Sequence, residues 1–147
     1  MIQIRQATFA DLDILAPLFD AYRQFYQQAS DVAAAYEFLK ERFSHGESVI
    51  FLAFEGDQAL GFTQLYPSFS SVSMARVFIL NDLFVAHAGR RKGVATQLMQ
   101  AALDYAKALG AVRVSLTTAT DNANAQATYD AMGWQRDTRF IHYDFQL

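Results

Sequence analysis

The sequence predicts an α+β protein in which about seven strands form a mixed sheet and about four helices cover it. Strand-like and helix-like patterns follow one another in the order β-α-α-β-β-β-α-β-α-β-β. Apolar residues make up 52% of the chain, with 13 Phe and 7 Tyr, and this composition indicates a packed core rather than disorder. With 147 residues, the chain has the length of about one domain, so residues 1–147 are expected to form a single one.

The first third of the chain predicts one strand and two helices. Apolar and polar residues alternate over Ile2–Arg5, which indicates a short strand. A helix is expected over Thr8–Tyr26, because Thr8 is a favoured N-cap residue and an acidic residue follows three positions later. A second helix is expected to start at a capping Ser30 or Asp31 and to run through Phe43.

The middle of the chain predicts three consecutive strands. Val49–Phe54 is a run of strand-forming residues, and Glu55–Gln58 reads as a hairpin turn into a returning strand over Ala59–Tyr66. Pro67 is expected to end that strand. A serine-rich loop then leads into a long strand over Val77–Val85.

The last third predicts two helices, each followed by a strand. Apolar residues at helical spacing predict a helix over Gly93–Leu109, with Gly110 as the residue that ends it. A strand is expected over Val112–Thr117, and a helix over Asn122–Met132 ends at a glycine. The alternating tail Arg139–Phe145 predicts a final strand that closes the sheet.

The composition limits the possible chemistry. The absence of cysteine excludes disulfides, cysteine nucleophiles and thiolate metal sites, and fits a cytoplasmic protein. The three histidines are isolated, so no metal site is expected. A net charge of -3 argues against nucleic acid as a partner, and no apolar run is long enough to cross a membrane.

A basic, glycine-containing turn follows the long strand and opens a helix. It reads Arg90-x-x-Gly93-x-Ala95, with Arg91 and Lys92 beside Arg90. The first turn of a helix has unpaired N–H groups and a positive end, which favour a phosphate group. The alternative is an ordinary helix start with solvated basic residues.

A second segment, Asn122-x-x-Ala125-x-x-x-Tyr129, precedes Gly133-Trp134. Its spacings of three and seven put these side chains on one helix face. The alternative is that Tyr129 is only a core aromatic residue.

With these two segments, nearly the whole chain resembles the GNAT superfamily of N-acetyltransferases, which use acetyl-CoA and have a mostly antiparallel sheet with the same element order. The nearest pattern is that of the polyamine and thialysine (diamine) acetyltransferase branch. The run Leu80–Val85 and the segment Tyr66-Pro67-Ser68 are similar to segments of that branch. Asn81 stands where the branch has glutamate and cannot take a proton, so a direct base at this position is not expected.

The resemblance implies roles for individual residues. Tyr129 would protonate the departing CoA thiolate, and Asp82 would hold or deprotonate the acceptor amine. The alternative for Asp82 is a structural carboxylate at a strand end. The acceptor is expected to contact Asn81, Asp82, Tyr22 and Tyr26, although the two tyrosines also fit a packed core. The acetyl-CoA site is expected to comprise Leu83, Phe84, Val85, Arg90, Arg91, Lys92, Gly93, Val94, Ala95, Thr96, Asn122 and Ala125.

The expected activity is acetyl transfer from acetyl-CoA to a primary amine, by direct attack in a ternary complex. The acceptor implied by the resemblance is a small cationic amine or a lysine-like side chain, and a protein lysine stays open. The alternative is a non-catalytic acyl-CoA-binding module on the same fold. The aromatic final strand also predicts a homodimer.

Overall fold

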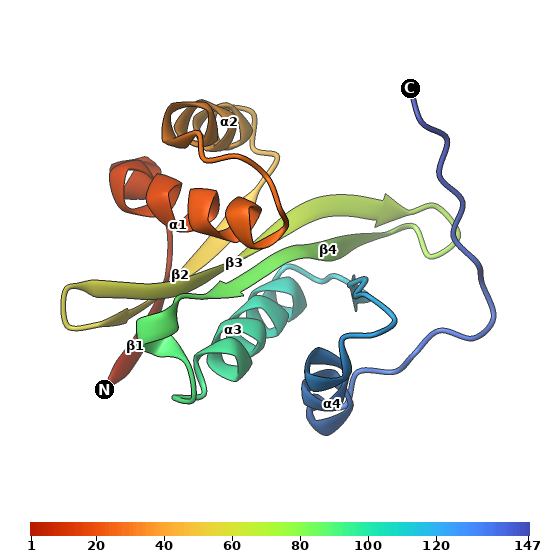
Figure 1. Cartoon of the computed structure of the whole chain (residues 1–147). Coiled ribbons are helices and arrows are strands. Elements are labelled where there is room, and N and C mark those ends of the chain that lie inside the picture. The colour runs from red at the N-terminus through yellow and green to blue at the C-terminus, as the bar shows by residue number, and fades with distance from the viewer. The chain divides into compact units, whose positions relative to one another are not determined.

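One five-stranded sheet organises the first part of the chain (Figure 1). The computed structural model describes all of residues 1–147, which form two units, residues 1–117 and residues 118–147. The first unit contains β1 (Ile2–Gln6), α1 (Leu12–Phe25), α2 (Val32–Ser44), β2 (Val49–Glu55), β3 (Gln58–Ser70), β4 (Ala75–Val85), α3 (Val94–Ala108) and β5 (Val114–Ser115). The second unit contains α4 (Ala123–Met132). No helix is both long enough and apolar enough to span a membrane.

The sheet is mixed, as the sequence predicts. Its strand order is β1-β2-β3-β4-β5; the first four strands are antiparallel, and β5 runs parallel to β4. The α+β class is therefore confirmed, with four α-helices and with five strands instead of about seven.

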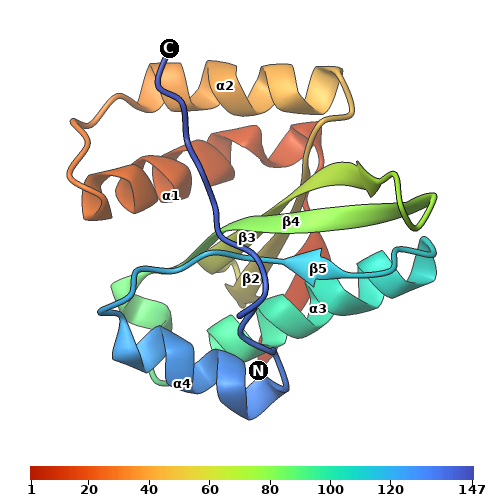
Figure 2. The ribbon, with the colours of Figure 1, turned by 90° about the vertical axis from the view of Figure 1, so that its right-hand side faces the viewer.

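The helices of the first unit cover both faces of the sheet (Figures 1 and 2). Alternate residues of β2 point to opposite sides. Ile50 and Leu52 pack in the cluster formed with α1 and α2, whereas Phe51 and Ala53 pack in the cluster formed with α3. Because β2 is buried on both faces, it reads as a continuous apolar run rather than as an alternating one.

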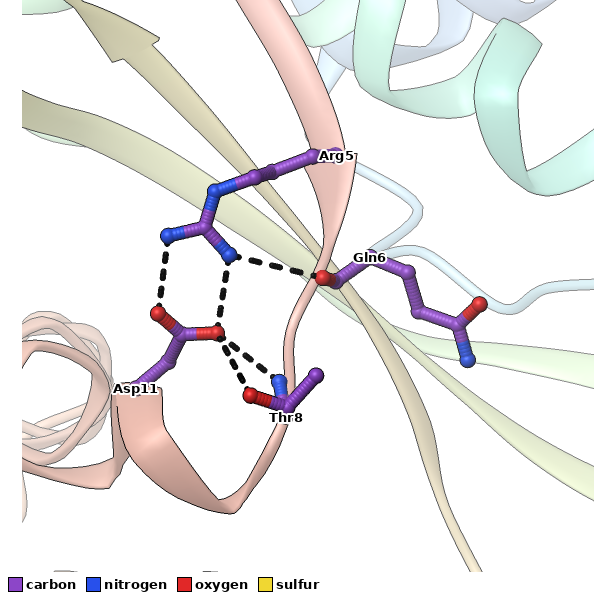
Figure 3. A network of polar contacts seen from close by, with 4 residues as sticks. All are labelled: Arg5, Gln6, Thr8 and Asp11. Atoms are coloured by element: carbon purple, nitrogen blue, oxygen red, sulfur yellow. Dashed lines mark hydrogen bonds and ion pairs between the residues drawn. The ribbon is translucent and has the colours of Figure 1, made fainter.

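A polar network fixes the start of α1 (Figure 3). The guanidinium of Arg5 donates two hydrogen bonds of 2.8 Å to the carboxylate of Asp11, and the N–H of Thr8 donates one of 2.8 Å to the same carboxylate. Thr8 and Asp11 form a capping box at a short 3-10 helix, Phe9–Asp11, that leads into α1. Thr8 therefore caps this turn, and the N-cap of α1 itself is Asp11. The hydrogen bonds donated by Arg5 are the main reason that the pKa of Asp11 falls from 3.8 to about 2.

The expected end of β3 at Pro67 is wrong, because the strand continues to Ser70. β2 pairs with β3 only as far as Leu65, whereas β4 pairs with it to the end. Beyond Leu65, β3 is therefore an edge strand on one side. A proline, which lacks an N–H group, is tolerated on such an edge.

Two further expectations about strands need correction. The strand predicted over Val112–Thr117 is only Val114–Ser115, because β5 pairs with just Phe78 and Ile79 of β4. The predicted final strand over Arg139–Phe145 does not form. Alternation shows which side chains can share a face, but a strand also needs a neighbouring backbone, and this segment has none within the chain.

Candidate active site

A β-bulge in β4 sets the orientation of Asp82. Gln64 of β3 pairs with Asp82 and Leu65 pairs with Leu80, so Asn81 is an extra residue without a partner on β3. The bulge changes which face the following residues occupy. Phe84 packs with the cluster of α1 and α2, whereas Leu83 packs with the cluster of α3.

Asp82 shares the face of Phe84, two residues later, and is directed toward α1 and α2. It is only 4% exposed and is surrounded by hydrogen-bond donors. The side-chain amides of Gln64 and Asn81 donate to its two oxygens, the latter at 3.0 Å. The hydroxyl of Ser48 donates to Gln64 at 2.6 Å and holds that amide in place. The sequence analysis missed Gln64 and Ser48, which are far from Asp82 in sequence and carry no local signal.

Two tyrosines, Tyr22 and Tyr66, lie within electrostatic range of this carboxylate. Burial, followed by the negative charge of Asp82, raises the pKa of Tyr22 far above its usual value. The same two causes raise the pKa of Tyr66 to about 12. The ring centroid of Tyr26, a largely exposed residue, lies 5.1 Å from that of Tyr22. The structure therefore brings together the four residues expected to contact the acceptor.

One edge of β4 is open next to Asp82. β5 pairs with Phe78 and Ile79 only, and no other strand of the sheet lies on this edge beyond them. No backbone hydrogen bond from outside the sheet reaches Asn81–Val85. Open strand edges carry unpaired N–H and C=O groups, so an extended ligand can bind there as an additional strand.

The basic turn presents an uncapped helix start. Gly93 is the N-cap of α3 and has a φ of 74°. Because glycine has no side chain, no capping hydrogen bond reaches the first turn of the helix from this residue. The first intrahelical hydrogen bond runs from Gln97 N–H to Gly93 C=O, at 3.2 Å, so the N–H groups of Val94–Thr96 precede it. Lys92 pairs with Glu55 at 2.8 Å. Arg90 and Arg91 are exposed and form no ion pair.

The second unit places the other predicted site residues on α4. Asn122 is the N-cap, and its side-chain oxygen accepts a hydrogen bond of 3.2 Å from the N–H of Ala125. Tyr129 is half-buried, and its ring centroid lies 6.2 Å from that of Trp134. Gly133 ends the helix with a φ of 93°, as the sequence predicts. The capping role thus occupies the oxygen of Asn122 and leaves its amide nitrogen without a hydrogen bond in the chain.

Comparison with known proteins identifies the family. The sequence model of the acetyltransferase (GNAT) family matches residues 15–134. The chain belongs to the GNAT family. It is 50% identical over 142 residues to an uncharacterized N-acetyltransferase of Bacillus subtilis (strain 168), YhfO, covering 97% of this chain and 95% of that protein. It is 35% identical over 96 residues to a probable acetyltransferase of Haemophilus influenzae, covering 65% of this chain and 66% of that protein.

A solved structure agrees with this assignment. The crystal structure of a probable acetyltransferase, 45% identical in sequence, matches with a TM-score of 0.93 and covers 99% of this chain and 97% of its own. The chain is thus an acetyltransferase of the GNAT kind, and such enzymes use acetyl-CoA. The uncapped helix start suits the phosphates of CoA, and the open edge of β4 suits the amide groups of its extended pantetheine arm.

Proposed function

We propose that this GNAT enzyme acetylates a primary amine by direct attack of the amine on the thioester of acetyl-CoA. Acetyl-CoA supplies the acetyl group as a thioester. The chain contains no cysteine that could carry the acyl group as a thiol ester, so both substrates are bound together. The observation that carries the proposal is the continuity of three features along one stretch of chain: the open edge of β4, the bulge at Asn81, and the uncapped start of α3.

The chain's contribution to rate is positioning. Backbone groups of Leu83–Val85 hold the pantetheine arm, and the N–H groups of Val94–Thr96, with Arg90 and Arg91, hold the phosphates. N–H groups at the bulge donate to the thioester oxygen as negative charge develops there. In the second unit, Asn122 binds the pantetheine arm through its amide nitrogen, and Tyr129 protonates the departing thiolate.

The amine end is assigned to Asp82 and its tyrosines. The buried negative charge of Asp82 attracts an ammonium group, and the proton leaves through Asp82 or to water. Similarity to the polyamine and thialysine branch supports a small amine or a lysine-like side chain as acceptor. A protein lysine fits the same chemistry.

A substitution at Gly93 tests the donor site. A Cβ added at Gly93 or at Gly110 meets no atom within 4 Å, and both residues have a positive φ, 74° and 78°. Gly93→Trp and Gly110→Trp therefore impose similar backbone strain at opposite ends of α3. Only Gly93→Trp should abolish CoA binding in a calorimetric titration, with circular dichroism showing that both variants are folded. Unchanged CoA affinity in a folded Gly93→Trp variant would contradict the proposed donor site.

Thiol release tests catalysis itself. Acetyl-CoA is incubated with polyamines, amino acids, aminoglycosides and lysine peptides, and free CoA is measured. Amine-dependent release above the hydrolysis rate is expected with at least one class. CoA binding without release across the whole panel would indicate a non-catalytic acyl-CoA-binding module.

A further inference from the structure

A cavity of about 660 Å³ lies beside the candidate active site, between α2 and the paired ends of β3 and β4, residues 66–70 and 75–79. Tyr66 lines it, and Gln64, two residues earlier on the same face of β3, binds Asp82, so this end of the cavity is close to the buried carboxylate. Binding sites for small molecules commonly have this size. An acceptor whose amine reaches Asp82 can place its remaining atoms here.

The cavity lining is basic. A basic lining is not expected for a pocket that receives only a cationic acceptor. Arg42 and Arg76 line it, and Glu47 is the one acidic side chain among its lining residues. The Nε of Arg42 is 3.1 Å from Glu47, so these two charges largely compensate each other. The guanidinium of Arg76 makes no ion pair and no hydrogen bond within the chain. Arg76 is therefore an uncompensated positive charge.

The aromatic lining holds both guanidinium groups. The guanidinium of Arg76 lies over the ring of Phe69, 5.3 Å from its centroid, and that of Arg42 lies over Phe38 at 4.9 Å. Phe69 and Arg76 are direct partners on β3 and β4, which explains why they stack. A stacked guanidinium loses less side-chain freedom when it binds, and its planar donors match the two oxygens of a carboxylate.

We propose that the acceptor carries a carboxylate in addition to its amine, and that Arg76 binds this carboxylate. The inference rests on the proposed acetyl transfer and narrows its acceptor to amino acids and similar amino-carboxylates. Asp82 attracts the ammonium end, and Arg76 attracts the carboxylate end. A diamine without a carboxylate would place its second positive charge near Arg76, where it is repelled.

Matched pairs of amines test the proposal. Lysine and cadaverine differ only by a carboxylate, as do ornithine and putrescine. Thiol-release kinetics should give a kcat/KM about 10–100-fold higher for the carboxylate-bearing member of each pair, mainly through a lower KM, which is the usual effect of a hydrogen bond to a charged group. Arg76→Gln should lower the value with lysine to near that with cadaverine. Arg113→Gln, an exposed arginine outside the cavity, is the matched control and should keep the preference.

Calorimetric binding of lysine and cadaverine separates this inference from the proposed function. Turnover without a preference for the carboxylate, or a preference that survives in Arg76→Gln, would overturn the inference and leave acetyl transfer standing. Tighter binding of lysine that depends on Arg76, with no turnover of any amine, would support the inference and overturn the proposed function. Absence of both binding and turnover would overturn both.

Discussion

At the scale of single residues, Asp82 owes its environment to Asn81. If β4 alternated without interruption, Asp82 would share the face of Phe78, four residues earlier, whose ring lies 5.8 Å from that of Tyr105 on α3. The bulge turns the carboxylate toward Gln64 and Tyr22 instead. One inserted residue thus produces a buried negative charge beside an open strand edge, a combination that suits an ammonium group next to a bound thioester.

The proposed role of Tyr129 as proton donor can be tested with a single substitution. Tyr129→Phe keeps the ring that lies beside Trp134 and removes only the hydroxyl. If Tyr129 donates the proton to the thiolate, kcat should fall about 10²–10⁴-fold with little change in acetyl-CoA affinity. Steady-state kinetics with a calorimetric titration measure both quantities. Wild-type kcat in the variant would assign this proton to water or to another group.

At the scale of elements, the start of α1 depends on the ion pair of Arg5 and Asp11. Their hydrogen bonds tie the end of β1 to the first turn of the helix, so α1 is fixed relative to the sheet that it covers. Asp11 is nearly buried, but the side chain of Arg5 is 50% exposed, and water therefore screens their attraction.

This arrangement predicts a pH-dependent stability. Folding lowers the pKa of Asp11 from 3.8 to about 2, so the stabilisation is present above pH 3.8 and is lost as the pH falls through about 2. Asp11→Asn should reduce the free energy of unfolding at pH 7 by about 1–2 kcal/mol, and the deficit should shrink as the pH falls below 4. Urea titrations from pH 7 to pH 3 measure this. Asp13→Asn is the control in the same helix, because Asp13 forms no ion pair. A deficit that does not change with pH would assign the loss to the cap hydrogen bond alone.

The same elements show which features of the structure could be predicted from the sequence and which could not. Periodicity predicts the helices and the hairpin, because burial on one or two faces leaves a pattern in neighbouring residues. The bulge at Asn81 leaves no such pattern, since it depends on how β3 and β4 align. The same alignment brings Gln64 to Asp82, and the pairing of β2 with β3 brings Ser48 to Gln64. The basic turn could be predicted because its chemistry lies in consecutive residues. The cavity beside Arg76 could not, because its lining comes from three separate stretches of the chain.

At the scale of the whole molecule, the C-terminal segment 139–147 exposes its large apolar side chains to solvent. Its five large apolar side chains are each at least 71% exposed: Phe140, Ile141, Tyr143, Phe145 and Leu147. We propose that a second copy of the chain covers this segment, so that the enzyme is a homodimer. Five such side chains from each of two copies, at roughly 150 Å² each, come near the roughly 1,600 Å² of a standard stable interface.

The dimer predicts a mass of twice 16.5 kDa by light scattering at micromolar concentration. Replacing both Ile141 and Phe145 by aspartate should shift the mass to that of one chain, because the carboxylates would be buried in the interface. Leu109→Asp is the control, since Leu109 is an exposed apolar residue at the end of α3. A mass of 16.5 kDa for the unaltered protein would refute the dimer.

The position of the one tryptophan has a practical consequence for this molecule. Trp134 lies in the second unit, two residues after the end of α4, whereas the sheet and three of the four α-helices lie in the first. Indole fluorescence therefore monitors residues 118–147, while far-ultraviolet circular dichroism monitors mainly residues 1–117. Denaturation followed by both signals needs no label or engineered probe. Coincident transitions mean that the two units unfold cooperatively, and separate transitions give each unit its own stability.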